Sequence, residues 1–314
     1  MKARLSWLIL ALAGALILLA CMLVHRRSVV DQKSAQEAFE KGRSLFYGKA
    51  DFDAAIAAFT EAIRLNPEWA EAHYERGSAL DVGKREYDKA IADYDDAIRL
   101  KPDFALAYYA RGVKWGIKRE YDRAMADLNE AIRLDPNLTE AYGDRGRGYY
   151  QTGENDKAIS DFGEMLRLLD MKWNPRLAAF AHYSRGLAYG RKRDHERAMA
   201  DFTEAIRLDP KLSKAYSNRG VVFNMAGEHE RALADLIEAI RLDPNFPHAW
   251  YGRGKVYYDK GDYDRALADF TEAIRLDPRS ADAYHARGVV KRKIGEKAKA
   301  EEDFAQAKEL GYKE

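Results

Sequence analysis

The side chains that could carry out chemistry are not spaced as a catalytic or metal site requires. The histidines are His25, His73, His182, His195, His229, His248 and His285, and no two of them have the HExxH spacing of a zinc site. The single cysteine, Cys21, excludes an intramolecular disulfide and a cysteine-based zinc site. A phosphate-binding GxxxxGK(S/T) loop is missing, and the carboxylates recur at fixed intervals, as on solvated helix faces. The sequence therefore predicts no enzyme, no cofactor, no metal site and no small-molecule substrate.

A motif that ends in proline recurs along the chain with a period of 34 or 35 residues. The stretch ADFTEAIRLDP occurs at residues 200–210 and again at 268–278. Related copies end at Pro67, Pro102, Pro136, Pro210, Pro244 and Pro278. An Arg-Gly pair has the same period, with its arginines at Arg76, Arg111, Arg145, Arg185, Arg219, Arg253 and Arg287. Such self-similarity predicts a stack of repeats rather than a single globular core.

Each copy has the pattern of two helices. In residues 211–244, apolar residues at helical spacing form two runs that Gly227 separates. Glycine accepts the left-handed conformation at a helix C-terminus, so we expect Gly227 to end the first helix. Pro244 ends the second, because the residue before a proline is pushed out of helical angles. Each copy is therefore expected to be a helix–turn–helix unit.

A 34-residue unit of this kind resembles the tetratricopeptide repeat. In residues 245–278 the matching residues are Trp250, Gly254, Tyr257, Ala266, Phe270, Ala273 and Pro278. The resemblance implies an all-α fold, a right-handed α-α superhelix (solenoid) of eight repeats. The expected repeats are 34–67, 68–102, 103–136, 137–170, 177–210, 211–244, 245–278 and 279–312. An insertion at about 171–176, which contains Trp173, is either a contact loop, a bend, or a connection folded onto the core.

One position departs from the pattern of that family. Arginine precedes the repeat glycine, where leucine is common in the family. We expect the stem of this arginine to pack between helices and its head to meet an acid of a second helix, such as Asp201 or Asp269. His73 and His182 stand where other copies have tyrosine or tryptophan, so we expect both to pack between helices.

The resemblance also implies where a partner binds. In this family the first helices line a concave groove that holds an extended peptide or a partner helix. The matching places hold Tyr74, Tyr109, Arg147, Tyr150, Gln151, Tyr183, Arg191, Asn224, Tyr251, Lys255 and Tyr258. Rigid aromatics with scattered arginine and amide side chains are typical of protein-binding surfaces. Packing of several tyrosines against the next unit explains the pattern equally well. The lysines and asparagines that hold chaperone tails in some members are mostly replaced here.

The N-terminal segment contains twenty residues without a charge, LSWLILALAGALILLACMLV, at residues 5–24. About twenty apolar residues span the core of a bilayer, whereas a basic start before an apolar middle is typical of a signal peptide. The sequence LLAC around Cys21 looks like a bacterial lipobox, which would make this cysteine a lipidation site. The residues that follow it stay apolar, which favours a spanning helix. Either alternative attaches the repeats to a membrane, with residues 28–33 as a short tether.

The distribution of charge disfavours nucleic acid as a partner. The N-terminal segment contains four basic residues and no acid: Lys2, Arg4, Arg26 and Arg27. The net charge of the whole chain is +1, so the rest of the chain is slightly acidic. We expect a non-catalytic scaffold that binds a protein or peptide. It would be attached to a bacterial inner membrane, or be a lipoprotein, with its repeats in the periplasm. One alternative is a lipoprotein adaptor that regulates envelope peptidases or cell-wall hydrolases. The other is an enzyme whose repeats dock its substrate.

Overall fold

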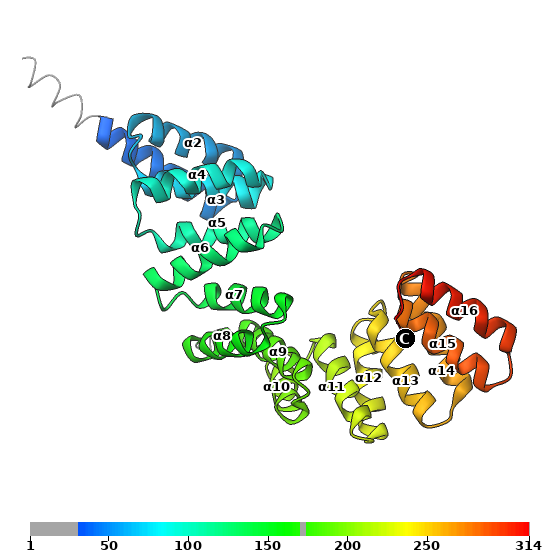
Figure 1. Ribbon diagram of the computed structural model, residues 1–314. Coiled ribbons are helices and arrows are strands. Elements are labelled where there is room, and N and C mark those ends of the chain that lie inside the picture. Colours follow the sequence, from blue (N-terminus) through cyan, green and yellow to red (C-terminus); the bar gives the residue numbers. More distant parts are fainter. Residues whose placement is uncertain (1–30, 170–173, 314) are drawn as a thin grey trace, which may run out of the picture. The chain divides into compact units, whose positions relative to one another are not determined.

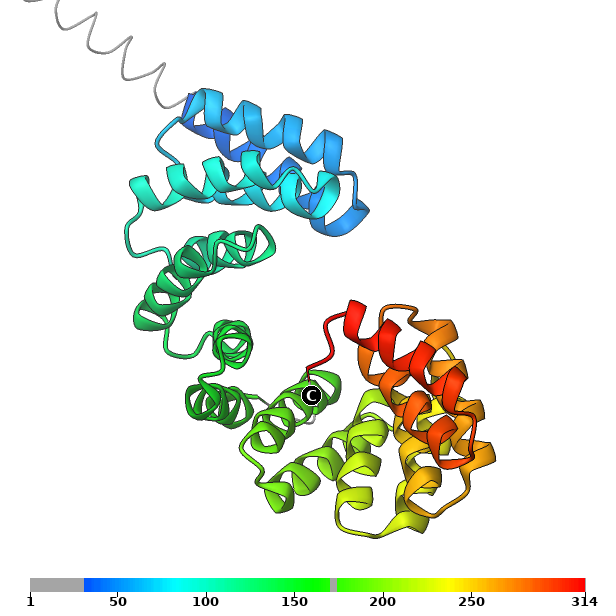
Figure 2. The same ribbon diagram turned by 45° about the vertical axis from the view of Figure 1, so that its right-hand side comes forward.

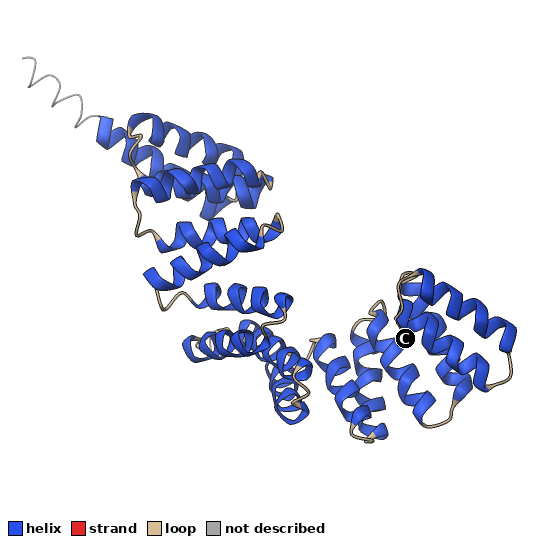
Figure 3. Cartoon of the chain, viewed as in Figure 1, coloured by secondary structure: helices blue, strands red, loops and turns tan. Residues whose placement is uncertain are grey.

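The computed structural model describes residues 31–169 and 174–313, and all regular elements in these ranges are helical (Figure 3). Residues 31–43 form a helix that continues into a π-helical turn, η1 (Ser44–Lys49). The further elements are α2 (Phe52–Leu65), α3 (Ala70–Ala79), η2 (Leu80–Lys84), α4 (Tyr87–Leu100), α5 (Ala105–Ile117), α6 (Tyr121–Leu134), α7 (Thr139–Thr152), α8 (Asn155–Leu168), α9 (Pro175–Arg191), α10 (His195–Leu208), α11 (Ser213–Met225), α12 (His229–Leu242), α13 (Pro247–Asp259), α14 (Tyr263–Leu276), α15 (Ala281–Lys293) and α16 (Lys297–Glu309). The expected lipidation site Cys21 and the apolar run around it lie outside the described residues, as does Trp173 of the insertion. Among the helices of residues 31–169 and 174–313, none is long and apolar enough to cross a bilayer.

Consecutive helices pack as hairpins that follow one another along the chain (Figures 1 and 2). We call residues 31–43 and the odd-numbered helices the first helices, and the even-numbered ones the second helices. The chain divides into two compact units after Asp144, and each unit is built from such hairpins. In the second unit, α11 contacts α13 directly, and α13 contacts α15. The expected all-helical array of repeats is therefore confirmed.

The two helices of a hairpin approach closely because a glycine of the first helix faces a large side chain of the second. A Cβ atom added to Gly186 of α9 would lie only 2.8 Å from the ring of Phe202 in α10. Gly254 of α13 stands in the same relation to Phe270 of α14, also at 2.8 Å. Phe202 and Phe270 are almost completely buried. The repeat glycine is thus the place where the ring of the second helix fits against the backbone of the first.

The ends of the helices also follow from local sequence. Gly227, after α11, has a φ of 77°, the left-handed conformation expected of it from the sequence. Arg193 adopts the same conformation at the equivalent place after α9, with a φ of 60°. At the start of α10 the side chain of Asp194 accepts a hydrogen bond from the backbone N–H of Arg197. Each hairpin therefore has a defined turn between its helices.

The arginine before each repeat glycine makes the ion pair that the sequence predicts. Arg185 donates two hydrogen bonds to Asp201, of 2.9 and 2.8 Å, and Arg253 donates two of 2.8 Å to Asp269. The same bidentate geometry joins Arg76 to Asp93, Arg111 to Asp127, Arg145 to Asp161, Arg219 to Asp235 and Arg287 to Asp303. All seven aspartates are buried, so each arginine neutralises a charge that would otherwise be costly inside the fold.

Several of these arginines also reach the preceding repeat. Arg111 donates to Asp95 of α4 at 2.6 Å, and Arg219 donates to the hydroxyl of Thr203 in α10 at 3.2 Å.

The ion pairs also change the pKa of the buried aspartates, as Asp201 shows. Burial alone would raise the pKa of the Asp201 carboxyl. The hydrogen bonds from Arg185 and His182 outweigh burial and hold that pKa below its ordinary value. The arginines therefore join the two helices of one repeat and tie that repeat to its neighbour.

Candidate protein-binding surface

The predicted groove residues lie on first helices of both units. Tyr74 and Tyr109 belong to the first unit, on α3 and α5, and the others lie on α7, α9, α11 and α13 of the second. The polar ones are the most exposed: Arg147, Gln151, Arg191 and Lys255 are all open to solvent. The tyrosines and Asn224 are half-buried. The face of the first helices therefore presents aromatic rings between exposed polar side chains.

The tyrosines three residues before the repeat glycine contribute to the core as well as to this face. The ring of Tyr183 lies 6.0 Å from that of Phe202, and the ring of Tyr251 lies 5.6 Å from that of Phe270. Burial raises the pKa of Tyr183, and that of Tyr251, to about 12. Tyr74 packs in the same way between Tyr94 and Phe104. These tyrosines therefore belong to the core as well as to the face, and a partner would contact only the exposed part of each ring.

Polar contacts join consecutive first helices within each unit. In the second unit Asn218 of α11 donates to the hydroxyl of Tyr183 at 3.4 Å. Asn224 of α11 donates to Asp259 of α13 at 2.7 Å. In the first unit the hydroxyl of Tyr109 donates to Asp144 at 3.0 Å. In each pair the residues are 35 positions apart, one more than the repeat period. Sequence reasoning missed Asp144, Asn218 and Asp259, although polar residues at this spacing were a signal that could have found them.

Tyr150 and Arg191 also join two consecutive first helices. The guanidinium carbon of Arg191 lies 3.6 Å from the centre of the Tyr150 ring, and its Nη1 donates to the Tyr150 carbonyl. A cation over an aromatic face at this distance is attracted by the ring quadrupole. The two residues are 41 positions apart, because the insertion adds six residues to the usual spacing. The structure therefore brings together two residues that the sequence predicted separately.

The first unit contains a buried acid that sequence reasoning did not single out. Glu75 of α3 accepts a hydrogen bond of 2.8 Å from the hydroxyl of Tyr47 in η1, and Arg43 lies 3.7 Å away. Burial raises the pKa of the Glu75 carboxyl, outweighing the opposite effects of Tyr47 and Arg43. A perturbed carboxyl of this kind can mark a functional site. Here its contacts tie the first repeat to the second, which is a structural role.

One group of side chains among the described residues lies close enough together to hold a metal ion, although the sequence predicts no metal site. It consists of His73, Asp93 and Asp96, and its ligand atoms lie within 4.8 Å of one another. His73 packs between helices as expected, whereas the direction of its ring could not be read from the repeat pattern.

Comparisons with known proteins agree with this architecture. Tetratricopeptide repeat families match residues 39–85, 84–113, 179–212, 223–261, 254–295 and 281–310. None of the curated proteins matches the sequence.

Two solved structures show the same fold. The crystal structure of the APC/C hetero-tetramer Cut9-Hcn1 aligns with a TM-score of 0.63 and 17% identity, over 87% of this chain and 52% of that one. The chain thus spans about half the length of that relative. A tetratricopeptide repeat protein from Parabacteroides merdae aligns with a TM-score of 0.56 and 20% identity, over 82% of this chain and 99% of that one. Together with the hairpins, the repeat glycines and the family matches, these likenesses show that the chain belongs to the tetratricopeptide repeat proteins.

Proposed function

We propose that the chain is a non-catalytic scaffold that binds an extended segment of a partner protein on the first helices of its second unit. The observation that carries the proposal is the row of contacts on that face. Three contacts hold neighbouring first helices together: Tyr150 with Arg191, Tyr183 with Asn218, and Asn224 with Asp259. A surface held in place in this way loses little conformational entropy when a partner binds.

The charge of this face favours an acidic partner. The exposed residues of the predicted groove in this unit are Arg147, Gln151, Arg191 and Lys255, which are cationic or neutral. The nearby acid Asp259 already accepts a hydrogen bond from Asn224. Complementary charge raises the association rate and the specificity more than the affinity. Arginine and tyrosine are the residue types most often found at the energetic centre of an interface.

Reversing two charges on this face tests the proposed surface. We expect Arg191→Glu combined with Lys255→Glu to lower recovery of the partner by about tenfold or more, because attraction becomes repulsion. The measurement is quantitative mass spectrometry of proteins crosslinked to the tagged chain and purified with it. The matched control is Arg207→Glu combined with Arg275→Glu, two exposed arginines of the second helices α10 and α14. Loss of the same proteins from both double variants, or from neither, would count against binding on this face.

We further propose that residues 5–24 attach the repeats to a membrane, as a spanning helix or through lipid on Cys21, with the repeats in a bacterial periplasm. The support is the uncharged length of the run, which matches the thickness of a bilayer core. If the anchor is a lipid, the protein would suit an adaptor of envelope enzymes.

Metabolic labelling with a fatty acid tests the kind of anchor. A lipid anchor would give label on the wild-type chain and none on the Cys21→Ala variant, because the thiol of Cys21 would carry the lipid. Membrane fractionation of both proteins is the control. An unlabelled wild-type chain that still pellets with membranes would show a spanning helix instead.

A further inference from the structure

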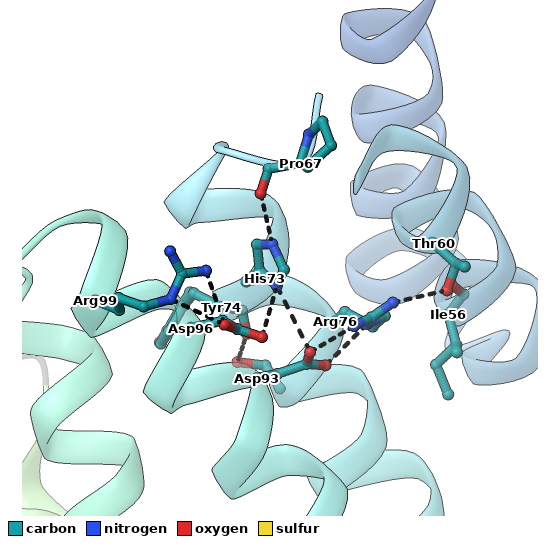
Figure 4. A network of polar contacts seen from close by, with 10 residues as sticks. Ile56, Thr60, Pro67, His73, Tyr74, Arg76, Asp93, Asp96 and Arg99 are labelled. Carbon is teal, nitrogen blue, oxygen red and sulfur yellow. Dashed lines mark hydrogen bonds and ion pairs between the residues drawn. The ribbon is translucent and has the colours of Figure 1, made fainter. Parts of the chain in front are cut away.

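The orientation of His73 decides which ring nitrogen carries the proton when the ring is neutral. Nε2 lies 3.0 Å from the carbonyl oxygen of Pro67, and a carbonyl only accepts, so Nε2–H is the donor (Figure 4). The equivalent place in the repeat of α13 is held by Trp250, whose indole N–H donates in the same way to the carbonyl of Pro244 at 2.9 Å. In the neutral ring the proton is therefore on Nε2, and Nδ1 carries the lone pair.

This nitrogen faces two carboxylates, with which it forms ion pairs when the ring is protonated. Nδ1 of His73 lies 3.8 Å from Oδ1 of Asp93 and 3.8 Å from Oδ2 of Asp96 (Figure 4). Both distances exceed hydrogen-bond range, and Nδ1 is buried without a hydrogen-bond partner. His73 is only 6% exposed, so this nitrogen lies inside the fold.

The spacing of the three atoms suits a metal ion between them. Zinc binds imidazole nitrogen and carboxylate oxygen at about 2.0–2.2 Å, which places tetrahedral ligands about 3.4 Å apart. Two of the observed separations are 3.8 Å and all three lie within 4.8 Å, so the ligands would have to move inward to bind an ion. Asp96 is the outermost ligand, with a side chain 44% exposed, and leaves a path from solvent. A histidine that binds metal usually donates its other ring N–H to a carbonyl or carboxylate, as His73 does to Pro67.

The two arginines beside the carboxylates favour a metal that also binds imidazole nitrogen over a hard cation. Arg76 holds Asp93 with two hydrogen bonds, and Arg99 holds Asp96 through Oδ1 only, which leaves Oδ2 for a metal. Because the two arginines already balance the two carboxylates, charge alone would not retain a hard cation such as Mg²⁺. The imidazole nitrogen instead favours a borderline metal such as Zn²⁺.

Other repeats show that this group is particular to α3 and α4. Tyrosine or tryptophan stands at the place of His73 in most repeats, at Tyr108, Tyr142, Tyr216, Trp250 and Tyr284. His182 also occupies that place, but its Nδ1 lies 2.8 Å from Asp201 and is therefore already paired. At the place of Asp96, that repeat has the longer Glu204, which bonds to Arg207. The chain thus contains its own matched control for His73.

We propose that His73, Asp93 and Asp96 bind one Zn²⁺ ion through Nδ1, Oδ1 and Oδ2, and that the ion joins the connection at Pro67 to helices α3 and α4. Water would complete the tetrahedron on the exposed side of Asp96. Zinc bound in this way stabilises the folded state by mass action, because the unfolded chain does not hold the three ligands together.

Zinc binding by the full-length protein tests the site. The protein is purified in a mild detergent without a histidine tag, stripped with EDTA, and titrated with Zn²⁺ in competition with a chromophoric chelator. We expect one equivalent to bind and to raise the thermal midpoint. His73→Tyr should weaken binding by at least about a hundredfold, because a ligand is lost. Tyrosine stands at this place in other repeats, so the variant should fold, and its helical circular dichroism in EDTA checks that it does.

Two further variants make the test specific. His182→Tyr should bind zinc as the wild type does, because its ring nitrogen is not part of the site. Asp96→Asn should bind about tenfold or more weakly, because the anionic ligand is replaced by an amide. A wild-type protein that binds no zinc, or a His73→Tyr variant that binds as tightly as His182→Tyr, would overturn the proposal.

Discussion

Replacing Arg253 with methionine is expected to lower the free energy of unfolding by about 3 kcal/mol, because it leaves a buried carboxylate without its cation. Asp269 is only 5% exposed, and both its oxygens accept from Arg253. Methionine keeps most of the apolar stem, so the loss reports the ion pair rather than the packing. The measurement is urea unfolding followed by circular dichroism at neutral pH.

The control for this prediction is Arg275→Met, in the second helix of the same repeat. Arg275 is 64% exposed and pairs with Glu272 three residues earlier, so we expect its loss to cost less than about 0.5 kcal/mol. Adding Asp269→Ala to Arg253→Met should recover part of the stability, because the unpaired carboxylate is removed as well. Equal losses for Arg253→Met and Arg275→Met, or no recovery in the double variant, would show that the buried pair does not stabilise the fold.

The second prediction concerns Gly186, where alanine is expected to destabilise the protein by up to about 2 kcal/mol. The added methyl group would lie 2.8 Å from the Phe202 ring and 3.2 Å from Cβ of Asp201, closer than packing allows. Phe202 is buried and cannot move aside freely. Overpacking of this kind costs about 1–3 kcal/mol, and the better helix propensity of alanine offsets about 1 kcal/mol of it.

Gly190, one turn later in the same helix, provides the comparison for Gly186. An added Cβ there meets nothing within 4 Å, so Gly190→Ala should be neutral or stabilise the protein by up to about 1 kcal/mol. The two variants are compared by their urea midpoints and by hydrogen exchange in α9 and α10. If Gly186→Ala proves as stable as Gly190→Ala, the close approach of these two helices does not depend on the glycine.

The repeated part of this architecture could be predicted from the sequence because it is encoded locally and many times. The period placed the hairpins, Gly227 was expected to end its helix in the left-handed conformation, and the pairing of Arg185 with Asp201 was expected from their places in the repeat. These features depend on residues within one repeat or in adjacent repeats. Every copy therefore adds information about them.

The candidate binding surface was only partly predictable. Tyr150 and Arg191 were both expected on the groove face, but only the structure shows the arginine lying over the ring. The sequence did not predict the contribution of three residues, Asp144, Asn218 and Asp259. Each of them pairs with a residue on a neighbouring first helix rather than within its own helix. Which residues meet there depends on how neighbouring hairpins are offset, and the residues of a single repeat do not determine this offset.

The sequence by itself determined the fold, the helix ends and the buried ion pairs, and tertiary structure alone decided the directions of individual side chains. His73 and His182 hold the same place in the repeat, and the sequence predicted packing for both. The ring of His73 turns Nε2 to Pro67, whereas the ring of His182 turns Nδ1 to Asp201. A repeat period specifies where a Cα atom lies on its helix. The rotation of the side chain about its own bonds depends on atoms from three elements at once, and these come together only in the folded protein.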